Sequence, residues 1–227
     1  MILLKFIAAV VLGYLLGSVP FGLIMARRHG KVDIRQYGSG KTGATNVLRT
    51  AGKKAAAIAA ALDVSKGVMA AVFAGLIVGE SYLIVGKVGL GSLVAEALAA
   101  IAAVVGHNWS VFLKFRGGRG VATFFGGLVA LCPPAAIFGG EIILIGAGLT
   151  RYASLGSIAG AVGSYVILVP LTIIEGFPLE YLFYSLVGVI IILAMHRDNI
   201  QRLISGKERR LGEKAEKAET PPVDKGA

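Results

Sequence analysis

The chain has 227 residues, of which 56% are hydrophobic and 16% are charged. Its mean hydropathy of +0.76 is typical of a protein whose solvent is largely lipid, because a soluble domain of this length carries more charge on its surface. The composition therefore excludes an ordinary soluble enzyme and predicts an all-α, polytopic membrane helix bundle.

The formal charge of +10 comes from 23 Lys and Arg residues against 13 Asp and Glu residues. The basic residues flank the apolar runs, so they indicate membrane orientation and not a nucleic-acid partner. The single cysteine, Cys132, excludes an internal disulfide and a thiolate metal cluster. His, Asp and Glu are nowhere grouped with ligand spacing, so we expect no metal ion and no other cofactor. No obligate protein partner is evident.

The first apolar run covers residues 2–25 and is predicted to span the membrane. Arg27 and Arg28 follow it directly, which places the N-terminus outside and the next loop, 27–54, on the cytoplasmic side. The run has no cleavage site of a signal peptide, so we expect it to stay as an anchor. Pro20 should kink the helix and free backbone groups that neighbouring helices must satisfy.

The stretch 38–49 of the first cytoplasmic loop is predicted to bind an anion. Three glycines within six residues allow the backbone to curl and direct several N–H groups to one point. The residues expected to contact a phosphate or carboxylate include Ser39, Gly40, Gly43, Thr45, Asn46 and Arg49. The stretch is not a nucleotide-binding P-loop, because Arg35 stands where that motif requires glycine.

The second and third spans are predicted at 55–79 and 90–106, and both carry polar residues. Asp63 and Lys66 share one face of the second span at a spacing of three residues. Lys66 therefore either pairs with Asp63 as a structural ion pair or also helps the site. His107 follows the third span, where a structural and a functional role both stay open.

A second glycine-rich basic loop follows the third span. Lys114, Gly117, Gly118 and Arg119 lie directly before a predicted helix, and the unpaired N–H groups at a helix start attract anions. We therefore expect a second anion-binding cradle at this point.

Residues 120–150 contain Pro133 and Pro134 at their middle and are predicted to form a hairpin of two short spans. Two further spans are expected at 153–174 and 179–195, and the basic residues that follow place the C-terminus in the cytoplasm. The total is seven transmembrane spans. Residues 1–213 form the membrane domain, and the Lys-, Glu- and Ala-rich residues 214–227 are expected to be a disordered tail.

Two smaller polar junctions are expected on the same face of the membrane. The junction before the sixth span contains Ser157. After the last span, His196, Asn199 and Arg202 follow at intervals of three residues, which places them on one face of a helix.

These separated motifs resemble those of the bacterial acyl-phosphate-dependent glycerol-3-phosphate acyltransferases. The resemblance rests on residues 38–49, 63–67, 106–123, 152–157 and 196–203, in this order, and covers nearly the whole chain. It implies an enzyme of phospholipid synthesis that crosses the bacterial cytoplasmic (inner) membrane several times and has its active site on the cytoplasmic face.

The implied reaction transfers a fatty acyl group from acyl phosphate to the 1-hydroxyl of glycerol 3-phosphate, giving 1-acyl-glycerol 3-phosphate (lysophosphatidic acid) and phosphate. The resemblance implies catalytic roles for His196, Asn199, Arg119 and Arg49. It implies substrate-binding roles for Ser39, Gly40, Gly43, Thr45, Asn46, Lys66, His107, Lys114, Gly117, Gly118 and Ser157. The implied partners are the two substrates and the lipid bilayer.

Two positions depart from the family pattern. Arg119 stands where the family usually has lysine, and because arginine does not readily release its proton, we expect a phosphate clamp and not a proton carrier. Lys41 stands where the family usually has asparagine, and it either adds a charge or faces water. Acyl phosphate is already an activated anhydride, so we expect direct attack without an acyl-enzyme, helped by neutralisation of the leaving phosphate. The proton would go to a substrate phosphate or to His196.

The alternative class is a membrane transporter of an anionic solute. Glu96 and Glu141 are acids within apolar spans, as a substrate pathway would have them. A transporter predicts polar sites near the bilayer midplane and on both faces, whereas these motifs gather on one face. Neither acid is assigned a role.

Overall fold

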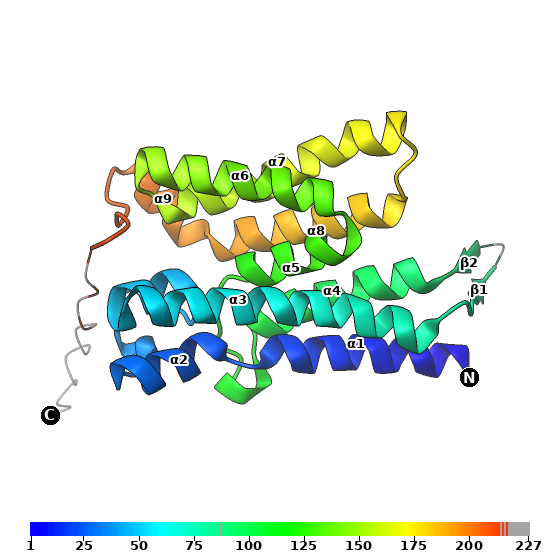
Figure 1. Cartoon of the computed structure of the whole chain (residues 1–227), viewed down its shortest axis with the longest axis horizontal. Helices are drawn as coiled ribbons and strands as arrows, with labels where there is room; N and C mark the ends of the chain where they lie inside the picture. The colour runs from blue at the N-terminus through cyan, green and yellow to red at the C-terminus, as the bar shows by residue number, and fades with distance from the viewer. Residues whose placement is uncertain (87, 214, 216, 218–227) are drawn as a thin grey trace, which may run out of the picture.

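The structure is a computed structural model that describes residues 1–86, 88–213, 215 and 217. The described part is mostly helical, as the composition predicts, and Figure 1 shows the course of the chain. Its elements are α1 (Ile2–Ser18), α2 (Phe21–Gly30), the 3-10 helix η1 (Ile34–Gln36), α3 (Ala44–Val78), β1 (Leu83–Val85), β2 (Val88–Leu90), α4 (Ser92–Asn108), the 3-10 helix η2 (Val111–Leu113), α5 (Val121–Leu131), α6 (Pro133–Thr150), α7 (Ala153–Ile174), α8 (Leu179–Met195) and α9 (Arg197–Ile204).

Two groups of helices run along a common direction, with α5 between them (Figure 1). The first group contains α1, α3 and α4, and the second contains α6, α7 and α8. Small residues allow close approach at α5: a Cβ atom added at Gly67 of α3 would meet the carbonyl oxygen of Thr123, and one at Gly126 would meet that of Val64. Helices α3 and α5 are thus in backbone contact.

Replacement of Gly67 by alanine is expected to lower the free energy of unfolding by about 1–3 kcal/mol, because the added methyl group overlaps the backbone of α5. Thermal unfolding in detergent measures this. Gly148→Ala in α6 is the matched control, since no atom lies within 4 Å of a Cβ atom at Gly148. Equal midpoints for the Gly67→Ala variant and the wild type would contradict the prediction.

Five helical segments are long and apolar enough to cross a membrane, and a sixth is obtained if α8 and α9, bent by 62°, count as one span. Helix α5 is also apolar but has 11 residues. Its length of about 16 Å is well below the roughly 30 Å of a hydrocarbon core. The predicted number of seven spans therefore depends on whether α5 is counted.

Both prolines interrupt helices as predicted, and at Pro20 the predicted kink is a full break. Helix α6 begins at Pro133, directly after Cys132 ends α5, and Pro20 separates α1 from α2. At Pro20, neighbouring elements donate hydrogen bonds to the freed carbonyl oxygens, as expected. Ser110 Oγ donates a hydrogen bond to the oxygen of Ser18 at 2.6 Å, and Lys66 Nζ donates one to that of Val19 at 3.2 Å.

The predicted loop 27–54 is wrong in its extent, because α2 continues to Gly30 and α3 already begins at Ala44. The glycine-rich stretch is therefore half loop and half helix start. Gly52, with φ 84° and ψ 177°, interrupts α3 without ending it. A small hairpin, β1 and β2, joins α3 to α4 and was not predicted, because strands of three residues are too short to show an alternating pattern.

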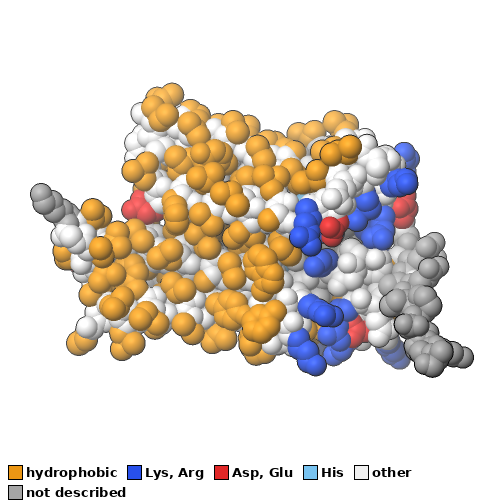
Figure 2. All heavy atoms as spheres, turned by 180° about the vertical axis from the view of Figure 1, so that it is seen from behind, with side chains coloured by type: hydrophobic (Ala, Val, Ile, Leu, Met, Phe, Trp, Pro, Cys, Tyr) orange, Lys and Arg blue, Asp and Glu red, His pale blue; other side chains and the backbone are white. Residues whose placement is uncertain are grey.

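Lys and Arg side chains gather at one end of the molecule, whereas hydrophobic side chains cover most of the remaining surface in this view (Figure 2). Helices α2 and α9 lie at the basic end, and the N-terminus and the β1–β2 hairpin lie at the other (Figure 1). The predicted disordered tail falls mainly on residues 214, 216 and 218–227, which are outside the described residues.

Candidate active site

A cavity of about 670 Å³ opens at the basic end of the molecule. Its polar wall combines segments that are far apart in the sequence: the loop before α3, the starts of α3, α5 and α7, helix α9 and residues 208–209. The polar side chains that line it include Ser39, Lys41, Thr45, Asn46, Arg49, Arg119, Ser154, Ser157, His196, Asn199, Arg202, Glu208 and Arg209. Ser39 of the first glycine-rich loop and Arg119 of the second thus line the same cavity as His196.

An apolar arm continues from this polar wall along α3, α5 and α6. It is lined by Val64, Phe125, Val129, Ile137 and Leu144, among others. Val129 lies eight residues after the start of α5, which is about 12 Å along the helix axis. The cavity therefore joins a cationic chamber to a hydrocarbon-lined arm, as a molecule with a charged head and an apolar chain requires.

Three helix N-termini point their first residues at the chamber. Ala44 and Thr45 of α3, Val121 and Ala122 of α5, and Ala153 and Ser154 of α7 all line it. The N–H groups of these six residues have no hydrogen-bond acceptor within the described part of the chain. Each helix start carries a partial positive charge, so the chamber favours anions before any side chain is considered.

Asn46 holds the first glycine-rich loop in shape. Its Nδ2 atom donates to the carbonyl oxygens of Ile34, Tyr37 and Lys41 at 3.0–3.1 Å. The Asn46 amide nitrogen therefore does not donate to an anion as expected, because these three carbonyl oxygens occupy it. The Asn46 side-chain oxygen has no partner in the described structure. Gly38 and Gly40 have φ of 57° and 66°, so the loop needs glycine for its turns.

The second glycine-rich loop differs from its prediction in a similar way. The N–H groups of Gly117 and Gly118 donate to the carbonyl oxygens of Asn108 and His107, each at 3.0 Å. These two N–H groups are therefore not free to bind an anion. The free N–H groups of this segment are those of Val121 and Ala122 at the start of α5. A Cβ atom at Gly118 would overlap His107 Nε2, so glycine is required there for close packing. Lys114 is exposed, and it is not part of the cavity wall.

Lys66 belongs to a buried cluster behind the cavity. Its Nζ atom lies 2.8 Å from Asp63 Oδ1 and 2.8 Å from His107 Nδ1, and its side chain is 1% exposed. The predicted Asp63–Lys66 pair is confirmed, and the structural reading of Lys66 is favoured because it does not line the cavity. His107 and Asp63 reach the wall from this cluster.

Arg119, in the loop before α5, is a partly buried cation of the chamber. Burial and the nearby charge of Arg202 lower its pKa to about 10. The guanidinium still carries its charge at neutral pH, and its Nε atom has no partner among the described residues. Arg119 can therefore bind an anion at every ordinary assay pH.

The Arg119→Lys variant should acquire a pH limit that the wild type lacks. Lysine starts from an ordinary pKa of 10.5, and the same burial and nearby charge of Arg202 are expected to lower it. Activity of the variant should therefore fall at a lower pH than wild-type activity does, because the deprotonated amine no longer binds an anion. Initial rates from pH 6 to 9.5 measure both limits, and superimposable profiles would contradict this prediction.

His196 lies between α8 and α9 and is 2% exposed. Its Nδ1 atom is 2.9 Å from the carbonyl oxygen of Ile192, an acceptor, so Nδ1 carries the proton and Nε2 is left as an acceptor. Burial and the charge of Arg119 lower the pKa of His196 to about 4. The imidazole is therefore neutral at physiological pH and can accept a hydrogen bond from a hydroxyl group.

The family model described as glycerol-3-phosphate acyltransferase matches residues 7–206. The chain belongs to the glycerol-3-phosphate acyltransferase family. Glycerol-3-phosphate acyltransferase 3 of Dehalococcoides mccartyi is 61% identical over 215 residues, which cover 95% of this chain and all of the relative. The enzyme of that family from Halalkalibacterium halodurans is 42% identical over 89% of this chain and 94% of its own.

The fold agrees with this membership. The crystal structure of PlsY (YgiH), an integral membrane glycerol 3-phosphate acyltransferase in its glycerol 3-phosphate form, matches with a TM-score of 0.78 and 36% identity. The match covers 91% of this chain and 96% of that one. The protein is thus an integral membrane acyltransferase.

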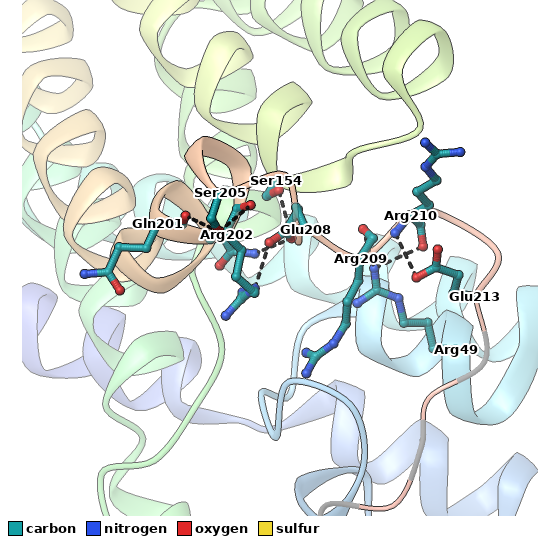
Figure 3. A network of polar contacts seen from close by, with 10 residues as sticks. Arg49, Ser154, Gln201, Arg202, Ser205, Glu208, Arg209, Arg210 and Glu213 are labelled. Carbon is teal, nitrogen blue, oxygen red and sulfur yellow. Dashed lines mark hydrogen bonds and ion pairs between the residues drawn. The ribbon is translucent and has the colours of Figure 1, made fainter.

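Glu208 is a residue of the acyltransferase chamber that the sequence motifs did not predict. Its carboxylate accepts hydrogen bonds from Ser154 Oγ at 3.1 Å, Asn199 Nδ2 at 2.7 Å and Arg202 Nε at 2.8 Å (Figure 3). It therefore ties α7 to α9 and uses the amide nitrogen of Asn199, which leaves the Asn199 oxygen for other contacts. The only signal in the sequence is an acid in a basic segment, and that signal does not give its position.

The remaining predicted residues are placed as follows. Ser39, Gly43, Thr45 and Ser157 line the chamber, whereas Gly40 shapes the loop beside it. Ser157 Oγ donates to the carbonyl oxygen of Ala153 at 2.7 Å and keeps its lone pairs. Within the described residues, no three His, Cys, Asp or Glu side chains are grouped as a metal site would need.

Proposed function

We propose that the enzyme transfers a fatty acyl group from acyl phosphate to the 1-hydroxyl of glycerol 3-phosphate. The observation that carries this proposal is the joining of a chamber of helix N-termini and cations to an apolar arm. Two phosphates fit the chamber, and the acyl chain fits the arm. The solved PlsY structures, named as a glycerol 3-phosphate form and a lysophosphatidic acid form of that protein, support the acceptor and the product.

In the proposed reaction, the hydroxyl oxygen of glycerol 3-phosphate attacks the carbonyl carbon of acyl phosphate. The new C–O ester bond forms as the bond between that carbon and the phosphate oxygen breaks, and inorganic phosphate leaves with the electron pair. Arg119 and Arg49 stabilise the charge on the leaving phosphate. His196 orients the hydroxyl through Nε2, with Asn199 beside it in the wall.

The hydroxyl proton is proposed to go to a substrate phosphate oxygen. An imidazole whose pKa is lowered to about 4 is a weak base, whereas a phosphate monoester dianion accepts a proton near pH 6. His196 therefore acts through a hydrogen bond. No acyl-enzyme is needed, because the donor is already activated.

We infer seven spans with the N-terminus outside and the chamber on the cytoplasmic face of the bacterial inner membrane. The accumulation of Lys and Arg at the end of the molecule that holds the chamber supports this orientation (Figure 2). In this arrangement α5 is a short span that reaches only part of the bilayer. Glycerol 3-phosphate would enter from the cytoplasm and the acyl donor from the lipid.

The donor is tested by phosphate release from the purified protein in detergent, with acyl phosphate in the presence and absence of glycerol 3-phosphate. A parallel reaction contains acyl coenzyme A. Release that depends on glycerol 3-phosphate, without use of the coenzyme A ester, is the expected result. No product with either donor from a folded protein would overturn the proposal and favour transport of an anionic solute, measurable as flux into sealed vesicles.

A further inference from the structure

A strap, formed by residues 208–213 together with 215 and 217, borders the chamber through Glu208 and Arg209. Leu211 N donates to the carbonyl oxygen of Arg151 at 2.7 Å, and Arg151 Nη2 donates back to that of Leu211 at 3.2 Å. The strap then reaches α3, where Ala215 N donates to the carbonyl oxygen of Arg49 at 3.4 Å, and Lys217 pairs with Tyr37 in a β-bridge. It therefore links the junction between α6 and α7 in one helix group to α3 in the other.

The strap lies beyond the residues that the family model matches, which end at residue 206. It nevertheless contributes two side chains to the chamber, those of Glu208 and Arg209. Glu208 fastens the start of the strap to α7 and α9. Figure 3 shows that the Arg209 side chain leaves the strap on the opposite side from that of Arg210. Arg209 lines the chamber, and Arg210 does not.

The strap backbone also holds Arg49. Arg49 Nη2 donates to the carbonyl oxygens of Arg209 and Arg210 at 3.2 and 3.3 Å (Figure 3). A guanidinium has five N–H groups, so three remain on Nε and Nη1, and the buried Nε atom has no partner among the described residues. The two carbonyls thus orient Arg49 and leave its other edge for an anion.

The side chains that line the chamber carry an excess of positive charge, to which Arg209 contributes. The lining cations are Lys41, Arg49, Arg119, Arg202 and Arg209. Arg202 is neutralised by Glu208 at 2.8 Å, and the other four pair with no carboxylate in the described structure. Two phosphates together carry about −3 to −4 at neutral pH, so four unpaired cations, with Arg209 among them, match the upper end of this range.

We propose that Arg209 is a direct ligand of the phosphate of glycerol 3-phosphate. The proposal rests on the proposed function. The strap meets glycerol 3-phosphate and not the acyl donor, because it lies at the water-facing mouth, away from the apolar arm where the acyl chain is held.

Calorimetric titration of the full chain in detergent with glycerol 3-phosphate, in the absence of any acyl donor, tests this proposal. Arg209→Ala should raise Kd about five- to tenfold, as expected for one charged contact at a partly exposed site. Arg209→Lys should restore most of the affinity. Lys207→Ala is the matched control, since it removes the same charge from an exposed residue next to the strap that does not line the cavity, and it should change Kd less than twofold.

A steady-state readout separates binding from folding. Arg209→Ala should raise KM for glycerol 3-phosphate with kcat within about twofold and with an unchanged thermal midpoint. Equal Kd values for wild type and Arg209→Ala, or an equal loss in Lys207→Ala, would overturn the role of Arg209 alone. Failure of the wild type to bind glycerol 3-phosphate would instead overturn the proposed function together with this inference, whereas failure to use acyl phosphate would leave the titration interpretable.

Discussion

Arg119→Ala and Arg49→Ala should each lower kcat/KM by about 10²- to 10³-fold. Both guanidinium groups line the enclosed chamber, and each has a buried Nε atom without a partner in the described residues. Removal of one such donor from a site where charge develops in the transition state typically has this effect. The measurement is the initial rate of phosphate release with acyl phosphate and glycerol 3-phosphate, at saturating and at limiting concentrations of each substrate.

Arg119→Lys is the control for this loss, because lysine keeps the charge at that position. It should retain a rate within about tenfold of the wild type at pH 7, where the amine is still protonated. Near-normal turnover in both alanine variants would refute the view that neutralisation of the leaving phosphate dominates catalysis. An alanine variant that loses activity together with its thermal midpoint would show a folding defect instead.

Lys66→Met should destabilise the fold more strongly than Gly67→Ala does. Lys66 and Asp63 form a pair at 2.8 Å whose side chains are 1% and 2% exposed. Removal of one partner leaves a buried, uncompensated charge, which costs about 3–5 kcal/mol. The thermal midpoint in detergent should therefore fall by about 10 °C, and the carbonyl oxygen of Val19 at the Pro20 break should lose its donor.

Two further variants test the reason for this loss. The double variant Asp63→Asn/Lys66→Met removes both charges and should recover a large part of the midpoint. Arg197→Met breaks the exposed Arg197–Asp198 pair, whose side chains are 82% and 64% exposed, and should leave the midpoint unchanged. A wild-type midpoint for Lys66→Met would show that the cluster does not stabilise the fold.

The sequence alone predicted the features that depend on local chemistry. Proline cannot continue a helix, so the breaks at Pro20 and Pro133 were predictable. A spacing of three residues puts side chains on one helix face, which gave the Asp63–Lys66 pair and the alignment of His196 with Asn199. Apolar composition gave the helical membrane fold, and the resemblance of several ordered motifs gave the family.

Only the tertiary structure decided how the polar groups are used. The backbone N–H groups of Gly117 and Gly118 and the side-chain amide of Asn46 donate hydrogen bonds to carbonyl oxygens within the protein. A polar group bonds the acceptor that the fold brings within reach, and spacing along the chain does not determine that acceptor. The places of Glu208 and Arg209 in the chamber depend on the strap returning across two helix groups. Contacts over such sequence separations follow from packing, whereas sequence periodicity reports only what lies within a few turns of a residue.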